Sequence, residues 1–211
     1  MNIILVGIQG SGKGTQARKI TEMFSYNFFE MGQKLRNFAD LDLPESQEVR
    51  EYLKEGKLVS IEMIGRILVH YKQTHKDGFV LFDGIPRTIE QKDMFDSVIK
   101  DYIVIFLDLK KDEAIRRLSL RRIDPITGES FGPEFKGEIN PETGNKLIFR
   151  SDDTPEAVSR RVETFYQNTL PLLALWASEG RKVYTIDAGK GIDEVFEEIQ
   201  YIIQNKIYSS I

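Results

Sequence analysis

The 211-residue sequence contains no cysteine. This absence excludes disulfide bonds and zinc sites built on thiolates, and it is compatible with an intracellular protein. Long apolar runs are also missing, because no stretch approaches the roughly 18 residues that are needed to cross a bilayer. The apolar run at residues 2–6 breaks directly into glycines, which is not typical of a secretory signal. We therefore expect a cytoplasmic protein with no membrane partner.

Basic charge is not in excess either. The net charge is −4 and the isoelectric point is about 5.4, whereas proteins that bind nucleic acid or anionic membranes present large basic faces. We expect no nucleic-acid partner, and a local basic cluster must hold any anionic ligand. With 41% hydrophobic and 29% charged residues, the composition is that of an ordinary globular domain. A chain of this length can bury about 70% of its unfolded surface.

What the sequence does contain is an alternation of strand-like and helix-like segments. Apolar, β-branched runs predict strands at residues 2–6, 79–82, 103–107 and 183–186, with a weaker one at 26–30. Patterns typical of helices lie at residues 15–24, 88–99, 112–122 and 155–180. The strand runs lack strict polar alternation, so both faces of each strand should be buried. This order predicts an α/β fold with a five-stranded parallel sheet flanked by helices.

The stretch GIQGSGKGTQ at residues 7–16 follows the first predicted strand. Glycines allow a turn whose backbone N–H groups converge on one point, and the following helix contributes its positive N-terminal end. Lys13 adds a full charge, so the pattern G-x4-G-K that ends at this lysine predicts a phosphate cradle. Gly14 stands where the pattern usually has serine or threonine, and the hydroxyl comes one position later, at Thr15. Direct Mg²⁺ ligation by the residue after the lysine is therefore lost.

Residues 123–149 hold four of the 16 glycines and three of the seven prolines, a density that predicts turns rather than a helix. Such a segment forms either a plain surface hairpin or a mobile flap over a site, and long insertions in compact domains are often functional. We favour the flap because arginines flank the segment on both sides. These are Arg117, Arg121, Arg122, Arg150, Arg160 and Arg161.

The glycine loop resembles that of adenylate kinases and related nucleoside monophosphate kinases. The resemblance continues in the same order over nearly the whole chain, through EGKLV (55–59), LFDGIPRTIEQ (81–91), RSDDTPEAVSRR (150–161) and DAGKGIDEV (187–195). It implies a fold of the P-loop NTPase type and the reaction ATP + AMP ⇌ 2 ADP with Mg²⁺. It also implies a core of residues 1–29, 60–121 and 152–211, a small helical monophosphate-binding lobe at 30–59, and a lid at 122–151.

Phosphoryl transfer between nucleotides requires that a charged group be aligned and neutralised, with little covalent chemistry by the protein. The planar guanidinium group binds phosphate oxygens in pairs, so arginine suits this task. The two aspartates before residue 154 would orient arginines, and they also precede the helix predicted at 155 as an N-cap would. The resemblance implies catalytic roles for Lys13, Arg87, Arg121, Arg150, Arg161, Asp152 and Asp153.

The resemblance also assigns binding residues to each nucleotide. ATP would contact Gly10, Ser11, Gly12, Lys13, Gly14, Thr15, Arg117, Arg121 and Lys190. AMP would contact Met31, Gly32, Arg36, Lys57, Leu58, Val59, Gly84, Arg87, Gln91, Arg150 and Arg161. Asp83, at the end of a predicted strand, would approach the Mg²⁺ of ATP through water. Gln91 would read the adenine of the acceptor, since an amide can meet both a donor and an acceptor on a base edge.

The stretch EMGQKLR at residues 30–36 departs from the family's usual STGDxLR. Met31 replaces a threonine hydroxyl, Gln33 also departs from the pattern, and Glu30 brings negative charge to a site for a phosphate. Two alternatives to adenylate kinase therefore stay open: a kinase for UMP, CMP or GMP, and a nucleotide-binding regulator with little turnover. Gln91 favours AMP as the acceptor. The lid has neither cysteine nor histidine, which excludes a zinc-bearing lid, and we expect a monomer.

Overall fold

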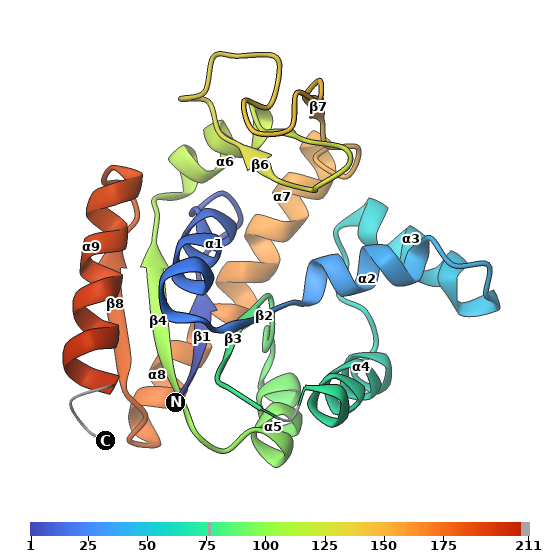
Figure 1. Ribbon diagram of the computed structural model, residues 1–211. Helices are drawn as coiled ribbons and strands as arrows, with labels where there is room; N and C mark the ends of the chain where they lie inside the picture. The colour runs from blue at the N-terminus through green and yellow to red at the C-terminus, as the bar shows by residue number, and fades with distance from the viewer. Residues whose placement is uncertain (76, 208–211) are drawn as a thin grey trace.

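A computed structural model describes residues 1–75 and 77–207 of the chain (Figure 1). Its centre is a parallel sheet with the strand order β2-β3-β1-β4-β8, which confirms the predicted fold class. β1 pairs with β3 on one side and with β4 on the other, so the loop that follows β1 lies at the middle of the sheet's carboxyl edge. The five strands are Asn2–Val6 (β1), Asn27–Glu30 (β2), Val80–Asp83 (β3), Tyr102–Asp108 (β4) and Val183–Asp187 (β8).

Helices cover both faces of the sheet, as the continuous apolar strand sequences predict. Figure 1 shows α1 (Lys13–Phe24) in front of the strands, and α7 (Pro155–Thr164) and α8 (Pro171–Ser178) behind them. The predicted helices α5 (Ile89–Val98) and α6 (Lys111–Ser119) are also present. Near the C-terminus, α9 (Ile192–Ile202) packs on α1 and continues as the π-helical turn η2 (Ile203–Ile207). No helix among the described residues has both the length and the apolar composition of a bilayer span.

The helix predicted at residues 155–180 is interrupted in its middle. A π-helical turn, η1 (Phe165–Thr169), separates α7 from α8, and the Leu170 N–H donates to the Phe165 carbonyl at 2.8 Å. Pro171 explains the interruption, because proline has no N–H and its ring clashes with the preceding turn of a regular helix. The wider turn presents Thr169, whose hydroxyl donates to the Arg87 carbonyl at 3.1 Å. This break in the helix therefore supports the loop that follows β3.

Residues 31–74 form the helices α2 (Met31–Ala39), α3 (Pro44–Glu55) and α4 (Ile61–Thr74). α2 and α3 pack together as an arm at one side of the core (Figure 1). Ser46 Oγ donates to the Phe38 carbonyl at 2.9 Å, and Arg50 Nη1 donates to the Ala39 carbonyl at 2.6 Å. These bonds satisfy carbonyls at the end of α2 that have no partner within the helix. Because α2 starts where β2 ends, the arm is anchored at the carboxyl edge of the sheet.

The glycine- and proline-rich segment folds into a small antiparallel sheet joined by turns, as its composition predicts. Its strands are Arg122–Ile123 (β5), Ser130–Phe131 (β6) and Ile148–Phe149 (β7), in the order β6-β5-β7. In Figure 1 this segment lies at the top of the molecule, beside α6 and above α1. An ion pair between Arg18 of α1 and Glu129 of the segment joins it to the core.

Asp124 is the centre of this segment and is inaccessible to solvent. Burial raises the pKa of Asp124, but its hydrogen-bond donors outweigh burial and lower the pKa below its ordinary value. An ionised carboxylate therefore ties together turns that are distant in the sequence. The donors are the N–H groups of Ile126 (2.8 Å) and Thr127 (3.1 Å), the Thr143 hydroxyl (2.6 Å) and the side-chain amides of Asn140 (2.8 Å) and Asn145 (3.1 Å).

Asp124→Asn should loosen this segment while the core stays folded. Asparagine places an amide N–H among groups that are all donors, so some of them lose their acceptor. Amide hydrogen exchange should become about tenfold faster in residues 122–149 and stay unchanged in β1 and β4. Glu138→Gln, at an exposed position of the same segment, is the charge-matched control and should have no effect. Equal protection in the Asp124 variant and the wild type would contradict this role of the carboxylate.

Candidate active site

A cleft of about 1070 Å³ opens at the carboxyl edge of the sheet. Its walls come from the loops after β1 and β3, the α2–α3 arm, the segment at residues 122–149 and the loop after β8. In open parallel sheets ligands bind at this edge, where neighbouring strands connect in opposite directions. β1 holds that position here, because β3 and β4 lie on its two sides.

The cleft brings together nearly all of the residues that the sequence predicted. Every predicted ATP- and AMP-binding residue lines it, from the glycine loop through the arm to Lys190, and Asp83 and Asp152 line it as well. Asp153 is the exception among the predicted catalytic residues: it does not line the cleft, and it reaches the site through the arginines described below.

The glycine loop leaves open space where a phosphate would lie. Gly12 has the left-handed φ of 87° and caps α1, and a Cβ atom added at Gly12 or Gly14 would meet nothing within 4 Å. The first N–H groups of a helix have no partner inside the helix, so α1 directs free donors and a positive dipole end toward this space. The local structure is therefore that of an anion site.

Lys13 is half-buried and lines the cleft. Its ammonium group donates to the Gly7 carbonyl at 2.8 Å and to the Ile8 carbonyl at 3.3 Å. Burial lowers the pKa of Lys13, and the negative charge of Asp83 partly opposes that shift. The loop's own carbonyls thus solvate a charge that a polyphosphate could neutralise.

Asp83 ends β3 and is only 7% exposed. Burial raises the pKa of Asp83, while Lys13 lowers it, so a bound cation would stabilise the ionised carboxylate. A single, largely buried carboxylate that lines the cleft fits a Mg²⁺ ion that keeps several waters and takes its other ligands from the nucleotide's phosphates.

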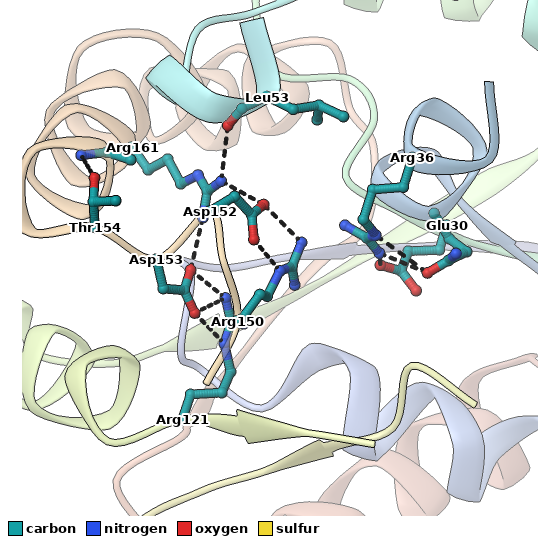
Figure 2. Close-up of polar contacts among 11 residues, drawn as sticks. Glu30, Arg36, Leu53, Arg121, Arg150, Asp152, Asp153, Thr154 and Arg161 are labelled. Carbon is teal, nitrogen blue, oxygen red and sulfur yellow. Dashed lines mark hydrogen bonds and ion pairs between the residues drawn. The ribbon is translucent and has the colours of Figure 1, made fainter. Parts of the chain in front are cut away.

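Three arginines share two aspartates at one side of the cleft (Figure 2). Arg121 donates two hydrogen bonds of 2.7 Å to Asp153. Arg161 donates to Asp153 at 2.8 Å and to Asp152 at 2.7 Å. Arg150 donates to Asp152 at 2.5 Å and 3.1 Å. The two carboxylates therefore gather three guanidinium groups from the turn after α6, from the residue that follows β7 and from α7.

The suggestion that Asp152 or Asp153 caps the following helix is wrong. Thr154 caps α7, since its hydroxyl accepts from the Ala157 N–H at 3.2 Å. Both aspartates are free to pair with arginines for that reason. Burial raises the pKa of Asp152, but Arg150 and Arg161 outweigh burial and lower the pKa to about 2.

Arg87 is held on the opposite wall by its backbone. Its N–H donates to Gln91 Oε1 at 2.8 Å, its carbonyl accepts from Thr169 at 3.1 Å, and its Nε donates to the Gly84 carbonyl at 3.0 Å. None of the carboxylates among the described residues forms an ion pair with its guanidinium group. Burial lowers the pKa of Arg87, and Asp83 partly compensates. Arg87 is thus a half-buried, oriented cation with capacity for an anion.

The remaining predicted residues make contacts that the sequence did not reveal. Gln91 is 4% exposed and already uses its amide oxygen for Arg87, so a base would meet the second lone pair and the NH₂ group. Lys190 forms an ion pair of 2.6 Å with Glu198 beside the cleft. Arg117 donates to Glu113 at 2.8 Å.

Several residues that shape the site were missed by sequence reasoning. Thr169 is one, and Pro171 within a helical pattern was the available indication of an irregular turn. Glu113 is another, and its spacing of four residues from Arg117 on one helix face predicts their pairing. The contact between Arg18 and Glu129 joins segments 111 residues apart, and nothing in the local sequence indicates it.

Comparison with known proteins agrees with this geometry. A family model for adenylate kinase matches residues 5–181. Adenylate kinase of Natronomonas pharaonis is 34% identical over 205 residues, covering 97% of this chain and 98% of its own length. Adenylate kinase of Pyrococcus abyssi is 32% identical over 96% of both chains, and adenylate kinase 2 of Schistosoma mansoni is 32% identical over 98% of this chain and 90% of its own. The chain therefore belongs to the adenylate kinase family of phosphotransferases.

Proposed function

We propose that this phosphotransferase catalyses the reversible, Mg²⁺-dependent transfer of a phosphoryl group from ATP to AMP, which forms two ADP. The observation that carries the proposal is the convergence of Lys13 and Arg87, both half-buried, with three clustered arginines around one cleft. A phosphoryl group in transfer carries much negative charge and is not bonded to the protein, so it needs several surrounding cations to stabilise it. The relatives named above are adenylate kinases, which supports adenine nucleotides on both sides.

The donor nucleotide would occupy the glycine-loop side of the cleft. Backbone N–H groups at the start of α1 would hold the β- and γ-phosphates, with Lys13 exchanging its loop carbonyls for phosphate oxygens. Arg117 and Lys190 would flank the adenosine part of ATP. Mg²⁺ held by the phosphates, by water and by Asp83 would supply charge neutralisation at the β- and γ-phosphates.

The acceptor would occupy the arm side. Arg36 and Arg87 would hold the phosphate of AMP, and Gln91 would meet the adenine edge. Residues 57–59, after α3, would line the base together with Met31 and Gly32. Met31 is only 2% exposed, so it can contribute a packing contact but not the hydroxyl that the family pattern has at this position.

In the transfer step, an oxygen of the AMP phosphate would attack the γ-phosphorus of ATP. The bond between that phosphorus and the β,γ-bridging oxygen would break, and its electron pair would stay on the β-phosphate. Arg121, Arg150 and Arg161 would stabilise the charge on the migrating group. Asp152 and Asp153 would act as positioning residues, because they contact the arginines and not the reacting atoms.

Closure of the cleft would complete this arrangement. We infer that residues 30–59 and 122–151 move as lobes over the core, since both line the cleft and each is joined to the core at a few points. Closure would exclude water, which otherwise hydrolyses ATP, and would bring Arg150 toward the phosphates. A monomer in the cytoplasm stays our prediction for the state and location of the enzyme.

A panel of acceptors tests the reaction. With Mg·ATP as donor, AMP should give ADP at a rate at least about tenfold above UMP, CMP or GMP, because Gln91 complements an adenine edge. A coupled assay for ADP with each monophosphate measures this. A faster rate with another monophosphate would favour the alternative kinase, and ATP binding with no turnover would favour the regulator.

Lys13→Ala should lower kcat by about 10²-fold or more while the fold stays intact, because one cation at the transferring group is lost. Initial rates with saturating ATP and AMP, together with the circular dichroism spectrum, measure both effects. Lys111→Ala, at an exposed position outside the cleft, is the matched control. A folded Lys13 variant with a near-normal kcat would rule out the phosphate cradle.

Asp152→Asn should flatten the acid dependence of stability. The folded-state pKa of Asp152 is about 2, below its ordinary 3.8, so the ion pairs stabilise the protein above pH 4 and lose that effect as the pH falls toward 2. Complete loss of this effect lowers the free energy of unfolding by up to about 2 kcal/mol. Urea unfolding at pH 7, 5 and 3 should show a smaller decrease for the variant than for the wild type or for the exposed Asp112→Asn control. Parallel pH profiles would contradict the assignment.

A further inference from the structure

We propose that Glu30 and Gln33 occupy the phosphate-binding edge of Arg36 when the acceptor site is empty, so that AMP must displace the Glu30 carboxylate in order to bind. Glu30 is therefore a determinant of acceptor affinity, and it acts against binding. This inference rests on the proposed role of Arg36 in holding the acceptor's phosphate. It concerns two of the residues at which the chain departs from its family's pattern.

The contacts of Arg36 show which nitrogens of its guanidinium group already donate hydrogen bonds within the protein. Glu30, the last residue of β2, accepts from Arg36 Nη2 at 2.9 Å (Figure 2). Gln33 Oε1 accepts from the same Nη2 at 2.8 Å and from Nε at 3.3 Å. Gln33 is fixed in turn, because its amide nitrogen donates to Asn37 Oδ1 at 2.7 Å. Nε and Nη2 of Arg36 both already donate to side-chain acceptors, Nε to Gln33 and Nη2 to Gln33 and Glu30.

The edge formed by Nε and Nη2 is one of those that a phosphate uses. A guanidinium group binds two phosphate oxygens through parallel N–H bonds, and the Nε–Nη2 pair presents them side by side. The remaining nitrogen, Nη1, lies close to the backbone of Gly32, where an added Cβ would be 3.2 Å away. A phosphate that approaches Arg36 from the cleft therefore competes with the two side-chain acceptors for the same donors.

Charge makes Glu30 the stronger of the two competitors. Its side chain is 32% exposed and lines the cleft, so a phosphate on Arg36 would lie beside a second negative group. Asp153 differs in this respect, because it pairs with Arg121 and Arg161 without lining the cleft. Asp153 can stay paired when a ligand binds, whereas Glu30 stands where the ligand's charge would be.

Glu30 also affects the charge balance on the acceptor side of the cleft. Burial lowers the pKa of Arg36, Arg87 and Lys13, and the negative charge of Glu30 partly opposes that shift. The same charge raises the pKa of Asp83, its register partner on β3. The carboxylate is therefore a stand-in for the acceptor's phosphate.

Glu30→Gln tests the proposal, because glutamine keeps an acceptor for Arg36 and removes the charge. The KM for AMP and the dissociation constant of AMP from the free enzyme should fall about two- to fivefold, the range for a partly exposed ion pair. The KM for ATP and the kcat should change less than twofold. Glu51→Gln, an exposed carboxylate on the same arm, is the control and should change none of these values.

A double-mutant cycle separates the Arg36 contact from a general charge effect. In an Arg36→Ala background, Glu30→Gln should change AMP affinity less than in the wild-type background, because the shared donor is gone. Glu30→Ser serves as a second variant if Glu30→Gln lowers the melting temperature. An unchanged or weaker AMP affinity in both folded variants would overturn the proposal. Absence of ATP-to-AMP transfer by the wild-type enzyme would instead refute the proposed function.

Discussion

The structure depends on keeping several like charges close together within one cleft. Lys13, Arg87 and Arg121 are each partly removed from water, and this desolvation lowers the pKa of all three. A buried charge without a partner is strongly destabilising. The protein compensates each one differently: backbone carbonyls solvate Lys13, two aspartates pair with Arg121, Arg150 and Arg161, and Arg87 relies on backbone contacts and on Asp83. These arrangements maintain the site before a nucleotide arrives.

The fixed and the adjustable parts of the site follow from the fold. The glycine loop, Asp83 and Arg87 follow or end strands of the central sheet. Their backbone cannot move without disrupting the pairing of β1, β3 or β4. The π-helical turn adds to that frame because Thr169 fixes the Arg87 carbonyl. Arg36 and Arg150 instead belong to the arm and to the segment proposed as the lid. In the proposed reaction, rigid positioning on the core and adjustable cations on these lobes would together allow a closed state to assemble around the substrates.

Much of this could be predicted from the sequence, and the reasons are local. Continuous apolar runs identified the five strands, and the G-x4-G-K pattern identified the loop after β1, because both depend on neighbouring residues. The π-helical turn could not be located, since Pro171 indicates an interruption but not the geometry that the chain adopts around it. The cap of α7 was assigned to the wrong residues, because aspartate and threonine are both good caps and only the arginines decide that the aspartates are used elsewhere. The Arg36–Glu30 pair depends on the turn from β2 into α2, which the sequence pattern did not specify.

A reversible transfer places an upper limit on how tightly either nucleotide should be held. If no carboxylate competed with AMP for the cations of the site, the enzyme would stabilise the bound ground state as much as the transition state. Such uniform binding raises the affinity for AMP without raising kcat. Carboxylates within the site change the ratio of ground-state to transition-state stabilisation. Where a carboxylate lies outside the cleft, as Asp153 does, it can hold an arginine in place through the whole cycle. Where it lies in the proposed position of the ligand's charge, as Glu30 does on Arg36, it would weaken ground-state binding and leave the arginines proposed for the migrating group unaffected. The positions of the two kinds of carboxylate would therefore separate affinity for the acceptor from stabilisation of the transfer step.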